Sequence, residues 1–254
     1  MSNFYIDTEF LEGTQTKRIL GIPFGQTNPT IDFISIGIVS EDSREYYAIS
    51  KDFNLKEAWN RYDEKPNMDY KPSLGGGSDG YYNPMFIKEY WIRENVLKPI
   101  YYDLIKFEFG ENSEHIVGEL SYKTFKELLQ KHGKTNKQIA EEVKEFVYEM
   151  SFKDNLGNAI IHENNWLNGK PQFYGYYSAY DHVALCWLFG KMIDLPKGFP
   201  MYTRDLKQEL DAIEEQSSCE VLKNHPNYPQ QTNEHSAIHD ARWNKQLHQF
   251  LKSL

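Results

Sequence analysis

An apolar run at residues 31–39, IDFISIGIV, constrains the fold of this 254-residue chain more than any other feature. Apolar or small residues occupy both of its alternating sets of positions, so both faces of a strand here would be buried. A strand that is buried on both faces lies in the interior of a sheet. Residues 31–39 therefore predict a central strand.

Two further strands are expected beside the central one. Residues 3–10, NFYIDTEF, and residues 46–50, YYAIS, are rich in aromatic and β-branched residues. The segment EDSRE, which follows the central strand, is typical of a turn. We expect the three strands to form an antiparallel meander.

The second half of the chain carries most of the helical signals. Apolar residues recur at helical spacing from Thr135 or Asn136 to about Met150, and residues 172–177, QFYGYY, are typical of a strand. Further helices are expected within residues 91–107, over 180–190 with Gly190 at the end, over 203–215 from Thr203, and from about Ser236 to Leu251. This order predicts an α/β fold with helices packed on a meander-led sheet.

Polar segments interrupt this pattern at about residues 11–30, 52–90 and 151–170. The first is typical of a loop, and the second is predicted to be irregular, with a flexible loop at Gly75, Gly76 and Gly77. The chain length suits one domain that carries insertions. We therefore expect a single domain over residues 1–254, with insertions at these three places.

Charge and cysteine usage narrow the function. The formal net charge is −9, whereas proteins that grip long duplex nucleic acid usually have a basic face. A nucleic-acid substrate would be held locally, by metal ions and by stacking on the aromatic residues that make up 15% of the chain.

Cys186 and Cys219 lack CxxC spacing, which argues against a zinc site or a disulfide framework, and Cys186 is expected in the core. With neither a signal peptide nor a membrane span in the sequence, we expect a cytoplasmic location and no membrane partner.

Two acidic residues on the first predicted strand are the first candidates for chemistry. Asp7 and Glu9 are two positions apart, so both would project from one face of the strand. Neighbouring carboxylates repel each other unless water or a cation separates them. Oxygen ligands suit Mg²⁺ or Mn²⁺. A solvated strand edge is the alternative for this pair taken alone.

Three residues further along the chain could complete such a site. Asp181 follows the strand at 172–177 and lies in the first turn of the next helix, where it could also serve only as a helix cap. His235 is expected at the entry of the last helix, and Asp240 is expected to point inward from its first turns. Because a histidine side chain titrates near neutrality, His235 could accept a proton from water, although a plain surface histidine is the alternative. His182 is more typical of a structural histidine in an apolar helix, and His239 has no motif spacing in its favour.

Together these residues form an ordered set: Asp-x-Glu on the first strand, Asp after a later strand, and His-x4-Asp on the last helix. In this the sequence resembles the DEDD superfamily of 3′-5′ exonucleases, in its histidine-containing subclass. The blocks FYIDTEFLEG, IDFISIGIVSEDSREYYAIS, SAYDHVALCWLFG, YTRDL and HSAIHDARW look most like the polyadenylate-specific exoribonuclease AS family. These blocks cover 57 of the 254 residues, and the three insertions lie almost entirely outside them.

The resemblance implies a fold and a function. The fold would be a ribonuclease H-like mixed sheet, with an antiparallel three-strand meander plus parallel strands, flanked by helices. The activity would be 3′-5′ hydrolysis of single-stranded RNA to nucleoside 5′-monophosphates, with an adenylate preference and a homodimer. Two Mg²⁺ ions, for which Mn²⁺ can substitute, would be held by Asp7, Glu9, Asp181 and Asp240, and His235 would be the general base.

Residues beside these motifs are candidates for substrate contacts. Phe10 or Leu11, directly after the acidic pair, could wedge against the terminal base, with a core position as the alternative. Thr203 and Arg204 match a Thr-Arg pair of the family. Arg204 could contact a phosphate or a second subunit, or form a surface salt bridge.

Three other functions compete with this hypothesis. The same chemistry could act on single-stranded DNA, because nothing in the motifs separates ribose from deoxyribose. The fold could also carry an inactive module that binds nucleic acid or protein, although all five site positions hold the required residue types. The third is a metal-dependent phosphatase acting on small molecules.

Overall fold

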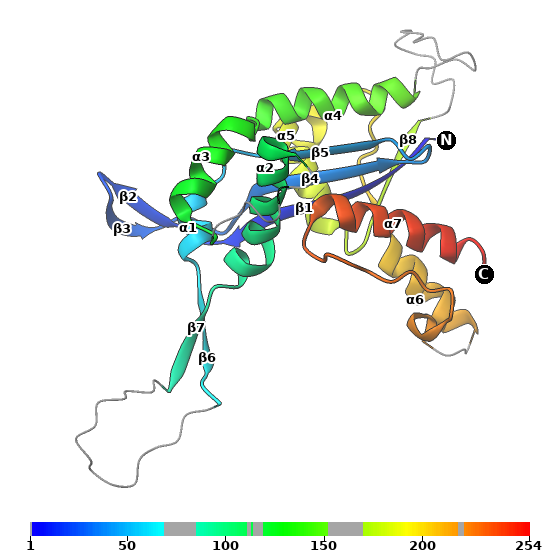
Figure 1. Cartoon of the computed structure of the whole chain (residues 1–254). Coiled ribbons are helices and arrows are strands. Elements are labelled where there is room, and N and C mark those ends of the chain that lie inside the picture. The colour runs from blue at the N-terminus through cyan, green and yellow to red at the C-terminus, as the bar shows by residue number, and fades with distance from the viewer. Residues whose placement is uncertain (1, 69–84, 111–112, 114–118, 152–169, 218–220) are drawn as a thin grey trace.

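The computed structural model describes residues 2–68, 85–110, 113, 119–151, 170–217 and 221–254 (Figure 1). Its centre is a five-stranded sheet in the order β5-β4-β1-β8-β9. The strands are β1 (Ser2–Gly13), β4 (Thr30–Ser40), β5 (Glu45–Ile49), β8 (Pro171–Gly175) and β9 (Arg204–Asp205). β1, β4 and β5 pair antiparallel, whereas β8 pairs parallel with both β1 and β9. The predicted mixed α/β sheet is therefore confirmed, and its arrangement is consistent with a ribonuclease H-like fold.

Helices cover both faces of this sheet (Figure 1). On one face, α4 (Asn136–Ser151) and α5 (Ala179–Phe189) bury Phe4, Ile36 and Ile38 of the sheet. On the other, α6 (Leu206–Ser217) and α7 (Ala237–Leu251) pack around Tyr5 and Val39. β4 is buried from residue 33 to residue 40, which confirms it as the central strand that the sequence predicted.

A third apolar cluster lies beside the second face. It joins α1 (Leu55–Asn60), the π-helical turn η1 (Arg93–Leu97), α2 (Lys98–Phe109) and α3 (Tyr122–His132) to Leu11 and Ile34. The register of β1 against β4 shifts between Glu9 and Phe10, so that Ile34 is passed over in the pairing. Such a bulge turns a side chain to the opposite face, and Ile34 thus packs with Leu11.

The alternation along β1 determines where a cleft can form. Tyr5 packs in the cluster under α7, and Leu11 packs in the cluster under α2. Asp7 and Glu9 share the same face of the strand and stand between these two apolar clusters. The carboxylates therefore occupy a gap between two packed regions.

Gly37 allows α7 to approach this gap closely. It pairs with Asp7 across the β1–β4 ladder, and a Cβ atom added to it would lie only 2.2 Å from the carbonyl oxygen of Ala237. A larger residue would push the start of α7 away from the sheet. The glycine therefore sets the distance between Asp7 and the first turn of α7.

Several sequence predictions are corrected by the structure. Residues 11–30 are not only a loop, because β1 extends to Gly13 and is followed by the ladder of β2 (Thr16–Ile19) and β3 (Ile22–Gln26). The segment 52–90 is not simply irregular, because it contains α1 and the paired strands β6 (Asp63–Pro66) and β7 (Phe86–Glu89). The side chains of β2, β3, β6 and β7 are mostly exposed, so these strands lack the buried alternation that reveals a strand in a sequence.

Other differences concern single elements. The helix predicted from Thr203 begins at Leu206, since Arg204 and Asp205 extend the sheet as β9. The helix α3 was not predicted, and short 3-10 turns occur at Met192–Asp194 and Leu222–Asn224. The predicted glycine loop at residues 75–77 and most of the insertion at 151–170 lie outside the described residues.

The remaining predictions agree with the structure. The helices expected near 91–107, 136–150, 180–190 and 236–251 are confirmed, with Gly190 and Ser236 as caps. Cys186 is buried and free, whereas Cys219 lies outside the described residues. Within the described ranges, no helix combines the length and the apolar character that a membrane span needs.

The close approach at Gly37 predicts the effect of one substitution. Gly37→Ala should lower the stability to urea denaturation by about 1–3 kcal/mol, because the added methyl group overpacks the β4–α7 contact. A Gly37→Ala variant that is as stable as the wild type would contradict this account.

Candidate metal centre in a carboxylate-lined cleft

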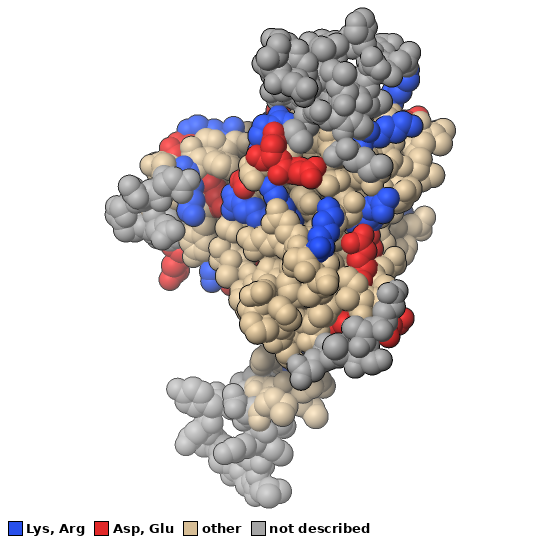
Figure 2. Space-filling view, turned by 90° about the vertical axis from the view of Figure 1, so that its right-hand side faces the viewer, with Lys and Arg blue, Asp and Glu red and all other residues tan. Residues whose placement is uncertain are grey.

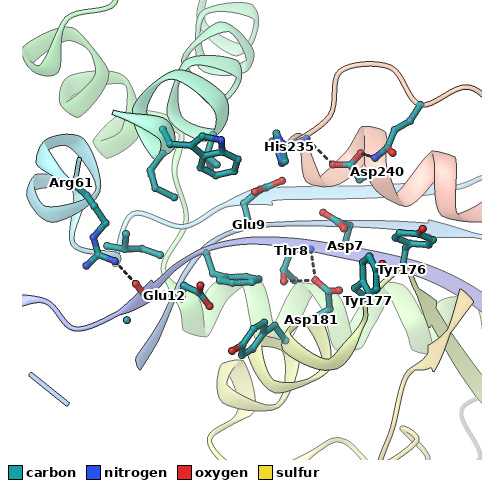
Figure 3. A pocket seen from close by; sticks show the side chains of 18 of the residues that line it. Asp7, Thr8, Glu9, Glu12, Arg61, Tyr176, Tyr177, Asp181, His235 and Asp240 are labelled. Carbon is teal, nitrogen blue, oxygen red and sulfur yellow. Dashed lines mark hydrogen bonds between the residues drawn. The ribbon is translucent and has the colours of Figure 1, made fainter. Parts of the chain in front are cut away.

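A cleft of about 700 Å³ opens above the carboxylates of β1. Its walls come from β1, from the start of α5, from the start of α7 with the loop before it, and from the bases of β6 and β7. Figure 3 shows Asp7 and Glu9 side by side on β1, with His235 and Asp240 facing them from the α7 side and Asp181 on the α5 side. Segments that are distant in the sequence thus meet here.

Three carboxylates form the centre of the cleft. Asp7, Glu9 and Asp240 each offer an oxygen atom, and these atoms lie within 4.8 Å of one another. Glu9 and Asp240 are buried, and Asp7 is partly buried. The structure therefore brings together three of the four acidic residues that the sequence singled out.

Asp240 is held in place by two hydrogen bonds. Its Oδ1 accepts a bond from Nε2 of Gln231 at 2.7 Å, and its Oδ2 accepts one from the backbone N–H of His235 at 2.9 Å. Asp240 lies in the first turn of α7, the turn whose backbone at Ala237 and Ile238 contacts Gly37. Its carboxylate is therefore oriented by the preceding loop and positioned by the helix.

Asp181 lies in the cleft but outside the group of three. Its Oδ1 accepts the backbone N–H of Thr8 at 2.9 Å and the hydroxyl of Thr8 at 2.6 Å. Thr8 projects from the face of β1 opposite to Asp7 and Glu9, so this pair lies below the strand in Figure 3. One oxygen of Asp181 is thereby occupied.

His235 lies before α7, at the entry that the sequence predicted, and it lines the cleft. Its φ of +66° is unusual for a residue with a side chain. Its imidazole packs edge-to-face against Trp91, with the ring centres 4.8 Å apart. The backbone bond to Asp240 and the contact with Trp91 together fix the ring at the rim of the cleft.

The electrostatics of the cleft favour a bound cation. Burial raises the pKa of Asp7 well above its ordinary value, and the carboxylates of Asp181, Glu9 and Asp240 raise it further. Burial followed by the neighbouring acids Asp240 and Asp181 raises the pKa of Glu9 to about 8. Burial also raises the pKa of Asp181 to about 7, against the lowering effect of the bonds from Thr8. Clustered carboxylates with these shifts are costly to ionise without a positive partner.

The donor set fits a hard divalent ion. Mg²⁺ and Mn²⁺ take carboxylate oxygens, and the described residues of the cluster offer only such oxygens around Asp7. Asp7, Glu9 and Asp240 could hold one ion among them, and Asp181 has its Oδ2 left for a second. The chemistry of the site therefore fits the Mg²⁺ or Mn²⁺ that the sequence predicted.

Phe10 and Leu11, the two residues predicted to contact the terminal nucleobase, differ in their exposure to solvent. Phe10 is partly exposed, lines the cleft and packs against Tyr180 with ring centres 5.4 Å apart. Leu11 is fully buried and belongs to the cluster under α2. The burial of Leu11 favours a core position over a contact with the terminal nucleobase. Phe10 is the partly exposed residue of the two.

The other residues considered from the sequence lie outside the centre. His182 accepts or donates a bond to the hydroxyl of Thr203 at 3.1 Å, and burial lowers its pKa. These contacts agree with a structural histidine. Arg204 is exposed, and its guanidinium lies 5.9 Å from the ring centre of Tyr174. Neither Thr203 nor Arg204 lines the cleft.

Four residues that orient the site were missed in the sequence. They are Thr8, Trp91, Gln231 and Asn244, and Nδ2 of Asn244 donates to the carbonyl of Ile6 at 3.0 Å. Thr8 and Asn244 could have been suspected, because Thr8 stands between the two acids and Asn244 lies one helical turn after Asp240. Gln231 is in a loop whose position no periodicity reveals, and Trp91 lies in the helical turn before η1, where its residue type alone does not indicate a contact with the site.

On the described part of the surface near the two chain ends, basic and acidic side chains are mixed. On the face turned to the viewer in Figure 2, Lys and Arg side chains are interspersed with Asp and Glu, and a broad area carries neither. This agrees with the net charge of −9 and with a local mode of substrate binding.

Comparisons with known proteins point to nuclease chemistry. Two proteins of Mycobacterium tuberculosis, from strains CDC 1551/Oshkosh and ATCC 25618/H37Rv, are each named a 3′-5′ exoribonuclease. Each is 25% identical to this chain over 239 residues, which is 94% of this chain and 86% of the relative. No protein-family model matches the chain. The similarity supports an exonuclease family in general terms.

The raised pKa values predict how stability depends on pH and metal. In EDTA, thermal stability should fall between pH 5 and pH 8, because the folded protein holds protons on Glu9 and Asp181 that the unfolded chain, with ordinary carboxyl pKa values, has already lost. Mg²⁺ should raise the melting temperature more at pH 8 than at pH 5. Differential scanning fluorimetry measures both effects.

Asp7→Asn is the control for this experiment, because it removes one charge at nearly constant shape. Its melting temperature in EDTA should depend less on pH than that of the wild type. A wild type that does not respond to Mg²⁺ at pH 8 would show that the cluster does not bind the ion.

The bonds from Thr8 predict a second effect. Thr8→Val removes the hydroxyl donor that lowers the pKa of Asp181, so more of this carboxyl is protonated at pH 7. Calorimetric titration should show Mn²⁺ binding weakened about tenfold, in line with the loss of one hydrogen bond to a charged group. Thr8→Ser should restore binding, and the loss in Thr8→Val should shrink at pH 9. Equal affinities of both variants at pH 7 would contradict this role of Thr8.

Proposed function

We propose that this protein is a metal-dependent 3′-5′ exoribonuclease that hydrolyses single-stranded RNA to nucleoside 5′-monophosphates. The observation that carries the proposal is the cluster of Asp7, Glu9 and Asp240, whose oxygens lie within 4.8 Å in a buried cleft. The two relatives named 3′-5′ exoribonucleases support it, since the similarity extends over 94% of this chain.

The proposal assigns the site to the histidine-containing DEDD subclass. Asp7, Glu9, Asp181 and Asp240 would hold two Mg²⁺ ions, with Mn²⁺ as a substitute. Such ions supply charge stabilisation for the oxygens of the phosphodiester group as the bond is broken. Thr8 and Gln231 orient Asp181 and Asp240 through their hydrogen bonds.

His235 is proposed as the general base. Its imidazole lies at the rim of the cleft beside Glu9, where it could take a proton from a water molecule that attacks the terminal phosphodiester (Figure 3). The contact with Trp91 restricts rotation of the ring. The nucleophile and the base would thus be held close to the carboxylates without a large rearrangement.

Phe10 is proposed to contact the terminal base. Its ring is partly exposed in the cleft, and Tyr180 supports it from the start of α5. An aromatic surface stacks on any base and favours large purines by contact area. Such stacking is compatible with a preference for adenylate, which the proposal takes from the resemblance of the sequence motifs. The proposal takes a homodimer from the same resemblance and a cytoplasmic location from the sequence.

The first experiment is a time course on 5′-labelled oligo(A), oligo(U) and a DNA strand of matching sequence, in Mg²⁺ or EDTA. A ladder that shortens from the 3′ end, is abolished by EDTA and is fastest on oligo(A) is expected. Faster digestion of the DNA strand would replace RNA by single-stranded DNA as the substrate. The absence of any digestion in Mg²⁺ or Mn²⁺ would refute the proposed activity.

Asp7→Asn should reduce hydrolysis at least about a hundredfold while the circular dichroism spectrum stays unchanged, because the central carboxylate of the cluster is lost. Asp194→Asn is the matched control, since Asp194 is exposed and lies outside the cleft. Full activity of Asp7→Asn at saturating Mg²⁺ would disprove the metal-ion mechanism.

A further inference from the structure

The ladder of β6 and β7 projects from the body of the protein, and its base forms one wall of the cleft (Figure 1). Arg61, Tyr62 and Asp63 contribute from the side of β6, and Glu89 and Trp91 contribute from the side of β7. This segment belongs to the insertion at about residues 52–90. The wall is therefore a part of the cleft that the matched exonuclease motifs do not include.

Two aromatic rings of this wall are exposed. The exposed fraction is 41% for Tyr62 and 38% for Trp91, and both residues line the cleft. Large aromatic side chains are costly to leave in water, and exposed apolar surface at a cleft often marks a binding site. Among the described residues that line the cleft, the ring contact of this pair is the edge contact between Trp91 and His235.

Neighbouring side chains hold the exposed rings of this wall in place. Tyr62 packs against Tyr90 with ring centres 5.8 Å apart, and Nζ of Lys88 lies 4.0 Å from the ring centre of Tyr62. The guanidinium of Arg93 lies 3.7 Å from the ring centre of Tyr90. Tyr62 is thus held by Tyr90 and Lys88, and Trp91 is held by its contact with His235. A platform of fixed rings loses little entropy when a ligand binds.

Arg61 ties this platform to β1. Its guanidinium donates hydrogen bonds to the backbone carbonyls of Glu12 and Thr14, at the end of the strand that carries Asp7 and Glu9 (Figure 3). Asp7 and Gly13 are six residue steps apart, which is about 20 Å along a strand at ~3.3 Å per residue. One nucleotide advances a stacked strand by roughly 3.4 Å, so the cleft extends over several nucleotides.

The charges of this wall determine what it can bind. Besides the metal-site carboxylates, the described lining includes Glu12, Asp63 and Glu89, and Arg61 is the only lysine or arginine among these residues. The guanidinium of Arg61 is already bonded to two carbonyls. The lining of this wall therefore offers little to phosphates and mainly aromatic surface to bases, and the two cations beside it, Lys88 and Arg93, lie against the rings of Tyr62 and Tyr90. Bases are accessible for stacking only in an unpaired strand.

From these observations we infer that Tyr62 and Trp91 form a stacking subsite for bases of single-stranded RNA that lie upstream of the two 3′-terminal nucleotides. The inference rests on the proposed exoribonuclease function and extends it to the length of RNA that the protein holds. The substrate is then a strand of several nucleotides, and a dinucleotide reaches only the metal centre.

The test compares hydrolysis of a hexanucleotide and a dinucleotide of RNA in Mg²⁺ by wild type, Tyr62→Ala and Tyr102→Ala. Tyr102 is the matched control, because it is also 41% exposed but lies on α2 outside the cleft. Tyr62→Ala should lower kcat/KM on the hexanucleotide about tenfold, as expected for one lost stacking contact. On the dinucleotide it should stay within about twofold of the wild type, and Tyr102→Ala should match the wild type on both substrates.

Tyr62 is the better probe, because Trp91 also contacts His235 and its loss would affect hydrolysis directly. An equal loss on both substrates, or no loss on either, would overturn the subsite while leaving the exoribonuclease function in place. The binding of a fluorescein-labelled hexanucleotide in EDTA, measured by anisotropy, separates the two proposals if no RNA is hydrolysed. Binding that Tyr62→Ala weakens about tenfold relative to Tyr102→Ala would support the subsite alone, and no binding by the wild type would overturn both.

Discussion

The repulsion among buried carboxylates is the constraint on which the rest of this structure depends. Asp7, Glu9 and Asp240 have oxygens within 4.8 Å of one another, and burial makes each additional charge more costly. The backbone brings these carboxylates together. Side-chain alternation on β1 places Asp7 and Glu9 on one face, and Gly37 lets α7 approach closely enough to place Asp240 beside them. The apolar clusters on either side of the cleft stabilise the arrangement. A site of this kind is unfavourable for the empty protein and favourable for a cation.

The sheet could be predicted from the sequence where burial controls the residue pattern. Residues 33–39 are buried on both faces, and the apolar run at residues 31–39 was sufficient to predict β4 as the central strand. The strands β2, β3, β6 and β7 were missed because their side chains are mostly exposed and are paired by local hydrogen bonds. For such ladders the sequence contains turn residues and charges but no apolar period. The bulge at Ile34 was also invisible, since an isoleucine suits either face.

The site was predictable to the extent that it follows secondary structure. Asp7 and Glu9 are adjacent on one strand, and Asp240 and His235 were recognised from their place at a helix start. The partners of these residues come from loops and from positions far away in the chain. Gln231 reaches Asp240 from a loop, and Trp91 reaches His235 across more than a hundred residues. Such contacts depend on the tertiary fold, which local patterns do not encode.

The pairing of β1 with β8 ends early, and this affects how variants of Asp181 are interpreted. β1 pairs with β8 only from Ser2 to Tyr5, so its backbone becomes a sheet edge beyond that point. There, Nδ2 of Asn244 donates a hydrogen bond to the carbonyl of Ile6, and Oδ1 of Asp181 accepts one from the N–H of Thr8. Side chains thus seal an edge that could otherwise recruit a strand from another molecule and start aggregation. Loss of Asp181 removes an edge seal as well as a carboxylate, so an inactive Asp181 variant is informative only when its solubility is measured too.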